Sequence, residues 1–380
     1  MTINLEKREI PVLLLTGYLG SGKTTLLNRI LANEKGIKFA VIVNDIGEVN
    51  IDASLIQQGG IVGQSDDSLV ALQNGCICCT LKMDLVAQIS DLAASRKFDY
   101  IVIEASGICE PAPIAQTIST IPVLGPQYVR DCLPYVDCIC TVVDALRMKD
   151  EFASGKALER DDIGDDDLER LVIEQIEFCN IVLLNKASEV TADELGTLRG
   201  IVKTINPGAR VLECNYGDVD LGEIIYTGSF NFDKVATSAA WIAAIEGEEE
   251  EDEAEGEALE YGIDTFVWNR RPAMSLNKFD DMVARKWPAN IIRAKGICYF
   301  SDKPDQCYLF EQAGRQKSIR EAGLWFATMP EDELQDMMER DRNLRRDWDP
   351  EYGDRMQKIV FIGQNLDKQA LAQLMDSCLE

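Results

Sequence analysis

The sequence contains no histidine, so any metal site in it must do without the commonest protein ligand for metal ions. It is also poor in basic residues, because 38 Lys and Arg stand against 65 Asp and Glu and leave a net charge of −27. A chain this acidic is repelled by the phosphates of nucleic acid and of anionic lipid surfaces. We therefore expect neither nucleic acid nor a membrane among its partners.

Long apolar runs are absent as well. No stretch approaches the roughly 18 uninterrupted apolar residues of a transmembrane helix. The residues MTINLEKREIPVLLLTG lack the layout of a signal peptide, because their apolar run is short and leads into a glycine-rich loop. We therefore expect a cytoplasmic protein. In that reducing compartment, a tight group among its 12 cysteines predicts metal binding or catalysis rather than disulfides.

An acidic block divides the chain, whose 380 residues suggest two or three domains. Residues 246–257, EGEEEEDEAEGE, contain nine acids and no base. Such a block repels itself and stays solvated, which predicts a disordered linker over 233–259. A weak cation-collecting role is the alternative. The predicted domains are then 1–232 and 260–380.

Ahead of the block, short runs rich in Val, Ile and Leu alternate with stretches of helical spacing, which predicts an α/β fold with a mostly parallel sheet. The predicted strands are PVLLLTG, FAVIVND, YIVIEASG, CICTVVDAL, NIVLLNKA and RVLEC, and the predicted helices span 23–34, 84–95, 167–179 and 192–204. After the block, we expect a smaller α+β domain. Its predicted strands are IDTFVWN, NIIRAKGICYF, QCYLFEQ, GLWFAT and KIVFIG, and its predicted helices span 275–286 and 366–378.

The segment LLLTGYLGSGKTTLL matches the phosphate-loop pattern G-x-x-x-x-G-K-[ST] between a predicted strand and a predicted helix. Its backbone N–H groups would wrap phosphates at the helix N-terminus. Lys23 would reach the β- and γ-phosphates, and the Thr24 hydroxyl would ligate Mg²⁺. We predict a nucleoside-triphosphate site of a P-loop NTPase. Its contact residues are Gly17, Gly20, Ser21, Gly22, Lys23, Thr24 and Thr25.

Two further segments carry carboxylates near predicted strand ends. VIVNDIGEVNID would be a switch loop, in which Asp45, Glu48 and Asp52 are candidates for holding Mg²⁺, its water shell or a neighbouring cation. The alternative for these three is an ordinary acidic loop. YIVIEASG ends in Glu104, which can hold Mg²⁺ or orient water, and the N–H of Gly107 can sense the γ-phosphate. The alternative for Glu104 is a surface residue at a strand end.

Base recognition is indicated by LLNKAS, in which Asn185 and Lys186 follow a predicted strand as in the guanine-recognising element Asn-Lys-x-Asp. The aspartate of that element accepts hydrogen bonds from both donor groups on the guanine edge. Here Ser188 stands in its place, and Glu189 comes one residue late. Serine cannot accept in the bidentate way of a carboxylate. Guanine is the favoured base, but how strictly the site selects guanine over adenine is left open.

Three cysteines, Cys76, Cys78 and Cys79, crowd the segment LQNGCICCTL. Their sulfurs converge only in a turn, which the preceding Gly75 favours, and three thiolates form a strong ligand set for Zn²⁺ or Cu(I). The fourth ligand would be a carboxylate such as Glu48, water or a group from a partner. An incomplete site of this kind suits a metal that leaves. Core packing and a redox relay are the alternatives.

These segments together resemble the CobW-like family of metal-chaperone GTPases, P-loop proteins related to the nickel-insertion GTPases. The resembling segments, in the family's order, are TGYLGSGKTTLLNRIL, VNDIGEVNID, NGCICCTL, VIEASGICEP, the later NK, RAKGICYF and KIVFIGQNLD. The resemblance implies a GTPase domain fused to a smaller C-terminal domain. It implies zinc or cobalt on Cys76, Cys78 and Cys79, and delivery of that metal to a client metalloprotein under control of GTP and GDP. A homodimer is compatible with it.

We predict a slow GTPase, because no arginine is identifiable as a charge-stabilising finger. Lys23 and Glu104 are the expected catalytic residues. Many relatives carry a histidine-rich tract, and its absence here argues against metal storage. Three alternatives stay open: a P-loop kinase, a thiol-based redox or metal sensor on a nucleotide-binding scaffold, and a purely structural zinc site.

Overall fold

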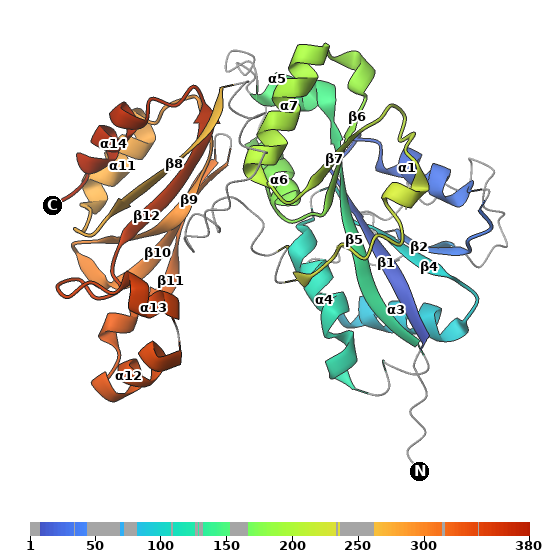
Figure 1. Cartoon of the computed structure of the whole chain (residues 1–380), viewed down its shortest axis with the longest axis horizontal. Helices are drawn as coiled ribbons and strands as arrows, with labels where there is room; N and C mark the ends of the chain where they lie inside the picture. Colours follow the sequence, from blue (N-terminus) through green and yellow to red (C-terminus); the bar gives the residue numbers. More distant parts are fainter. Residues whose placement is uncertain are drawn as a thin grey trace. The chain divides into compact units, whose positions relative to one another are not determined.

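Two separate β-sheets organise the chain (Figure 1). The computed structural model describes residues 8–33, 35–43, 69–71, 82–107, 109–125, 128, 132–152, 166–232, 235, 262–313, 316–340 and 342–380. The first sheet is parallel, with the strand order β3-β2-β4-β1-β5-β6-β7, and the second is antiparallel, with the order β11-β10-β9-β12-β8. The predicted α/β fold with a second, smaller α+β part is thereby confirmed.

The first sheet contains all six strands expected from the apolar runs. Its members are β1 (Arg8–Thr16), β2 (Phe39–Val43), β3 (Leu69–Ala71), β4 (Tyr100–Glu104), β5 (Cys132–Asp144), β6 (Ile181–Asn185) and β7 (Arg210–Glu213). β2, β4 and β6 are buried along their whole length, as expected for parallel strands covered on both faces. β3 escaped the sequence analysis because three residues carry no readable periodicity.

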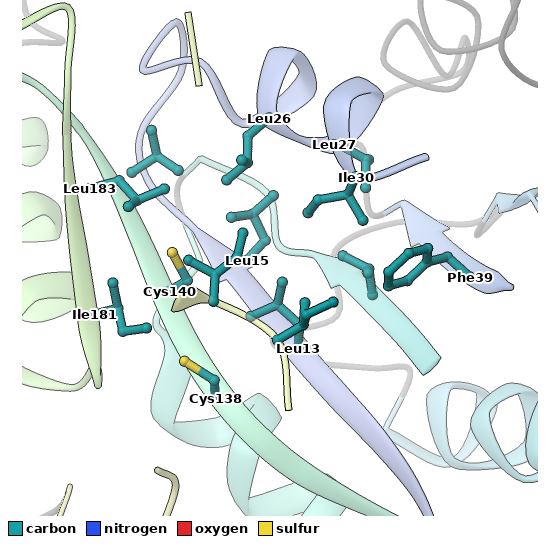
Figure 2. Close-up of a cluster of buried hydrophobic side chains, with 14 of the residues drawn as sticks. Leu13, Leu15, Leu26, Leu27, Ile30, Phe39, Cys138, Cys140, Ile181 and Leu183 are labelled. Atoms are coloured by element: carbon teal, nitrogen blue, oxygen red, sulfur yellow. The ribbon is translucent and has the colours of Figure 1, made fainter. Parts of the chain in front are cut away.

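Helix α1 (Lys23–Leu31) shows how a face of this sheet is covered. The helix places Leu26, Leu27 and Ile30 on one side, at helical spacing, and all three are fully buried against Leu13 and Leu15 of β1 (Figure 2). Burial of each side chain contributes about 1.5–3 kcal/mol to folding. This packing holds the start of α1 above the end of β1.

Further helices complete the first unit. They are α3 (Lys82–Ser95), α4 (Pro111–Leu124), α5 (Ala145–Phe152), α6 (Asp166–Glu177) and α7 (Ala192–Ile205). α3 and α4 contact β5, and none of their described residues belongs to the cluster around α1, so they cover the opposite face of the sheet. α4 was not expected from the sequence because it contains several prolines. Pro111 occupies its first turn, where the missing N–H costs no helical hydrogen bond.

The second sheet packs one face against helices α11 (Leu276–Arg285) and α14 (Lys368–Asp376). Its strands are β8 (Ile263–Arg270), β9 (Ile291–Phe300), β10 (Lys303–Ala313), β11 (Gln316–Leu324) and β12 (Gln357–Gln364), and two more helices, α12 (Glu331–Arg340) and α13 (Arg342–Asp347), precede β12. The core contains Trp268, Phe310 and Phe361 of the sheet beneath Phe279 and Met375 of the helices. Among the helices that the structure describes, none has the length and apolar character to span a bilayer.

One predicted strand, GLWFAT, is wrong in this part of the chain. β11 ends at Leu324, and residues Phe326–Thr328 form a 3-10 helix instead. Both oxygens of the buried Asp354 carboxylate explain the turn, because they accept hydrogen bonds from the N–H groups of Phe326 and Ala327 at 2.8 Å each. The local apolar pattern could not reveal a partner that lies so far along the chain.

Candidate nucleotide site

The predicted phosphate loop joins β1 to α1 at the carboxyl edge of the parallel sheet. β1 lies between β4 and β5, and the strand register pairs Leu15 with Glu104 and Thr16 with Thr141. Ligands of open parallel sheets bind at this edge, where the strand order changes direction. The loop therefore lies where the fold favours a ligand.

Two glycines of the loop are required both by their backbone conformation and by the lack of space for a side chain. Gly17 and Gly22 have positive φ angles of 132° and 109°, and an added Cβ would lie 2.3 Å from the Val142 oxygen and 2.2 Å from the Asn185 Nδ2 atom, respectively. Gly20 has a φ of 81° and open space around it. A side chain at either crowded position would push the loop off the strand ends.

Ser21 and Lys23 supply polar groups inside this loop. Ser21 is fully buried, and its Oγ has no hydrogen-bond partner among the residues that the structure describes. The Lys23 ammonium, 7 % exposed, donates to the carbonyls of Gly17 at 2.7 Å and Tyr18 at 3.2 Å. Because a cation at a helix N-terminus is disfavoured by the helix dipole, an anion beside it is favoured. The loop thus fits a phosphate group.

Thr24 and Glu104 come together although they lie far apart in the sequence. The Thr24 hydroxyl donates to Glu104 Oε1 at 3.5 Å, and Glu104 is only 1 % exposed at the end of β4. A hydroxyl and a carboxylate are the hard oxygen donors that Mg²⁺ prefers, with water completing its shell. These two predicted magnesium-site residues therefore fit the ion. Thr25 follows them in the first turn of α1.

The segment after β4 packs tightly on the phosphate loop. A Cβ added to Gly107 would lie 2.7 Å from the Leu19 nitrogen, so only glycine lets the two backbones approach this closely. Gln175 of α6 holds the segment in place, since its Nε2 donates to the carbonyls of Cys109 at 3.2 Å and Gly107 at 3.4 Å. Gln175 was not predicted from the sequence, because its helical position offers no signal of this contact.

The end of β6 is tied to the phosphate loop by Asn185. Its Nδ2 donates to the Ser21 carbonyl at 2.8 Å, and its Oδ1 accepts from the Gly217 N–H at 3.1 Å. Lys186 has a left-handed φ of 59° and forms an ion pair with Asp144 at the end of β5. Asp144 was also missed, although its place at the end of the apolar run TVVDAL could have indicated it.

The predicted zinc ligands and the predicted switch-loop carboxylates are not among the residues that the structure describes. Asp45, Glu48, Asp52, Cys76, Cys78 and Cys79 fall outside the described residues, as does the acidic block. The nine cysteines that the structure does describe are all buried thiols, as expected for small core residues. Burial raises the pKa of Cys179 to about 12 and that of Cys214 to about 11. The described residues contain no group of three or more Cys, Asp or Glu side chains able to hold a metal ion.

Comparison with known proteins covers both parts of the chain. The model of the CobW/HypB/UreG nucleotide-binding domain matches residues 11–213, and that of the cobalamin synthesis protein cobW C-terminal domain matches residues 263–379.

Two relatives and one solved structure align with nearly the whole chain. Zinc-regulated GTPase metalloprotein activator 1 of Dictyostelium discoideum is 34 % identical over 98 % of this chain and 80 % of its own length. Zinc chaperone YjiA of Escherichia coli is 28 % identical over 95 % of this chain and 96 % of its own length. The crystal structure of Zn(II)-bound YjiA GTPase from E. coli aligns with 98 % of this chain and 100 % of its own, at 21 % identity and a TM-score of 0.42.

Proposed function

Because the chain belongs to the CobW/HypB/UreG family of nucleotide-binding proteins, we propose that it is a slow GTPase that carries zinc and releases it to a client metalloprotein. The names of its relatives support zinc as the cargo, and cobalt is the alternative. The observation that carries the hydrolytic part is the contact between Thr24 and the buried Glu104 beside Lys23.

Each residue of the nucleotide site then has a distinct task. Lys23 exchanges its bonds to the loop carbonyls for bonds to the β- and γ-phosphates. Thr24 would hold Mg²⁺, which would neutralise charge on the phosphates when bound, and Asp45 is the proposed further residue that would support the ion. Glu104 orients the attacking water, and the Gly107 N–H contacts the γ-phosphate. Asn185 and Lys186 hold the base side of the pocket.

Zinc is bound by Cys76, Cys78 and Cys79 in this proposal, with Glu48 as the fourth ligand. Thiolates favour zinc strongly, and a single exchangeable carboxylate ligand lets the metal depart. If nucleotide exchange removed Glu48 from the zinc ion, only three thiolates would hold the zinc, and a client protein could compete for it.

The strand register supports coupling between the two sites. Val43 at the end of β2 pairs with both Ala71 at the end of β3 and Glu104 at the end of β4. Neighbouring strands lie about 4.8 Å apart, so the segment that leads into the cysteines leaves the sheet about 10 Å from Glu104. The segment with Asp45 and Glu48 leaves between them. The strand ends that precede the two proposed metal-binding segments therefore lie close to Glu104.

The proposal is tested by measuring zinc stoichiometry and GTP turnover on the same reduced protein. We expect one tightly bound zinc ion and measurable phosphate release from GTP. Cys78→Ser should lose the zinc and keep GTP binding. Cys132→Ala, which alters a buried cysteine at the first residue of β5, is the matched control and should keep both. Retention of zinc by Cys78→Ser would contradict the proposal.

A further inference from the structure

The position that should hold a base-reading carboxylate is occupied by a neutral pair. The Ser188 N–H and hydroxyl both donate to the Asn215 side-chain oxygen, at 2.9 and 2.8 Å. Asn215 belongs to the loop after β7, so the pair joins the loops that follow two neighbouring strands. Ser188 is exposed, which leaves it open to a ligand.

Backbone hydrogen bonds and close packing hold the two loops around this pair in place. The Ala187 N–H donates to the Cys214 carbonyl at 3.1 Å, and the Asp218 N–H donates to the Asn215 carbonyl at 3.0 Å. Gly217 packs so closely on α1 that an added Cβ would lie 3.0 Å from the Leu26 Cα atom. The loop carrying Asn215 is thus fixed against the helix that begins at the phosphate loop.

Two carboxylates that the structure describes close to this pair are already engaged in ion pairs. Asp144 is paired with Lys186, and Asp218 with Arg29, whose Nη1 lies 2.9 Å from its Oδ1. Glu189 follows Ser188 in a 3-10 helix, where successive side chains are turned by about 120°. Glu189 is therefore not a direct substitute for an aspartate at position 188.

The hydrogen-bonding capacity of the pair determines which base it accepts. Ser188 has given its only hydroxyl proton to Asn215, so it offers lone pairs, while the Asn215 amide offers N–H donors. Guanine presents N–H donors and the O6 acceptor, and adenine presents the N6 amino donor and the N1 acceptor. One acceptor beside one donor satisfies either edge. A carboxylate, in contrast, accepts twice from guanine and repels the adenine N1 atom.

We infer that Ser188 and Asn215 form the base-selecting group of this protein and that it admits both guanine and adenine nucleotides. The inference rests on the proposed function only in requiring that the phosphate loop binds a nucleoside triphosphate. Discrimination by a site that hydrogen-bonds its substrate reaches about 10⁴-fold when a mismatch leaves buried polar groups unpaired. A neutral pair, in which Ser188 is exposed and Asn215 is half-buried, leaves no charged group unpaired, so the selectivity is small.

The test is a competition titration of the full-length protein with Mg²⁺, in which GTPγS and ATPγS displace a fluorescent GDP analogue. We expect the two dissociation constants of the unaltered chain to differ by less than about tenfold. Ser188→Asp should widen the ratio in favour of guanine by about 100-fold, since two charge-assisted bonds replace one neutral bond and the Asn215 amide can turn its N–H₂ towards the new carboxylate. Glu189→Gln is the matched control and should leave the ratio unchanged.

Contrary results separate the inference from the proposed function. A guanine preference above about 100-fold in the unaltered chain overturns the inference and leaves the GTPase proposal intact. Loss of that preference in Glu189→Gln would instead assign base reading to Glu189. If neither nucleotide binds, the inference and the proposed function fall together.

Discussion

Glu104 is the buried carboxylate of the proposed nucleotide site. It is 1 % exposed, and the Thr24 hydroxyl contacts it at 3.5 Å. A buried carboxylate is costly unless a cation or hydrogen bonds compensate for the lost solvation. Its retention at the tip of a buried strand is explained if Mg²⁺ or its water shell completes the environment during turnover.

The substitution Glu104→Gln separates binding from hydrolysis. The amide keeps an oxygen for Thr24 and keeps the volume of the side chain, so GTP affinity should change by less than about threefold. The rate of phosphate release should fall by about 10²–10⁴-fold, the usual contribution of a group that positions or deprotonates the nucleophile. Single-turnover hydrolysis measures this. Glu110→Gln, an exposed residue that precedes α4, is the matched control, and an unchanged rate in Glu104→Gln would contradict the assigned role.

Among the elements of the first unit, Asp137 of β5 connects the segment after β7 to the sheet. Its buried carboxylate accepts from the Tyr100 hydroxyl of β4 at 2.6 Å and from the N–H groups of Thr227 and Gly228 at 3.1 and 2.6 Å. Burial, and then the neighbouring Asp137 charge, raise the pKa of Tyr100, so the phenol stays a donor at all ordinary pH values. The carboxylate therefore fastens the segment after β7 to the centre of the sheet.

Asp137→Ala should lower the free energy of unfolding by about 2–4 kcal/mol, because it leaves several donors without an acceptor. Tyr100→Phe removes one of those donors together with its bond and should cost about 1 kcal/mol. Urea denaturation followed by circular dichroism compares the two. Equal losses in both variants would mean that the carboxylate does not fasten the segment.

An element could be predicted from the sequence where its cause is a local pattern of residues, and not where its cause is a contact with a distant residue. β2, β4 and β6 were predictable because burial on both faces of the sheet selects apolar side chains at consecutive positions. β11 was missed because its exposed residues at the sheet edge are mostly polar. Phe326 and Ala327 were assigned to a strand because Asp354, which accepts hydrogen bonds from their N–H groups, lies far along the chain. At the site, Thr24 and Glu104 were predictable from motifs. Asn215 was not, since its role exists only through the neighbouring strand β6.

For the whole molecule, the sequence predicts two domains and a linker over 233–259, and we propose these boundaries for the protein. A glutamate-specific protease should therefore cut first within 246–257, where the acidic residues are concentrated. Brief digestion should yield two fragments that stay folded, as measured by mass spectrometry and circular dichroism. First cleavage within the residues of either sheet would contradict the boundaries.

The buried thiols make stability depend on alkaline pH. Burial raises the pKa of Cys138 and Cys179 from 9.0 to about 12. Between those values the folded state keeps protons that the unfolded state has lost, so the free energy of unfolding is full below pH 9 and falls as the pH rises towards 12. Denaturation under reducing conditions at pH 8, 9 and 10 measures this. Stability that rises over that range would contradict it.

The central claim is that nucleotide state controls zinc affinity, and a competitive zinc titration of the reduced protein tests it most directly. The apo, GDP-bound and GTPγS-bound states are compared, each alongside Cys78→Ser. We predict that zinc affinity differs by at least tenfold between the GDP-bound and GTPγS-bound states, which is about 1.4 kcal/mol of coupling. Zinc should then change the ratio of GTPγS affinity to GDP affinity by the same factor. The Cys78→Ser variant should show no shift. Equal zinc affinity in all three states would contradict the claim and leave zinc with a structural or sensing role.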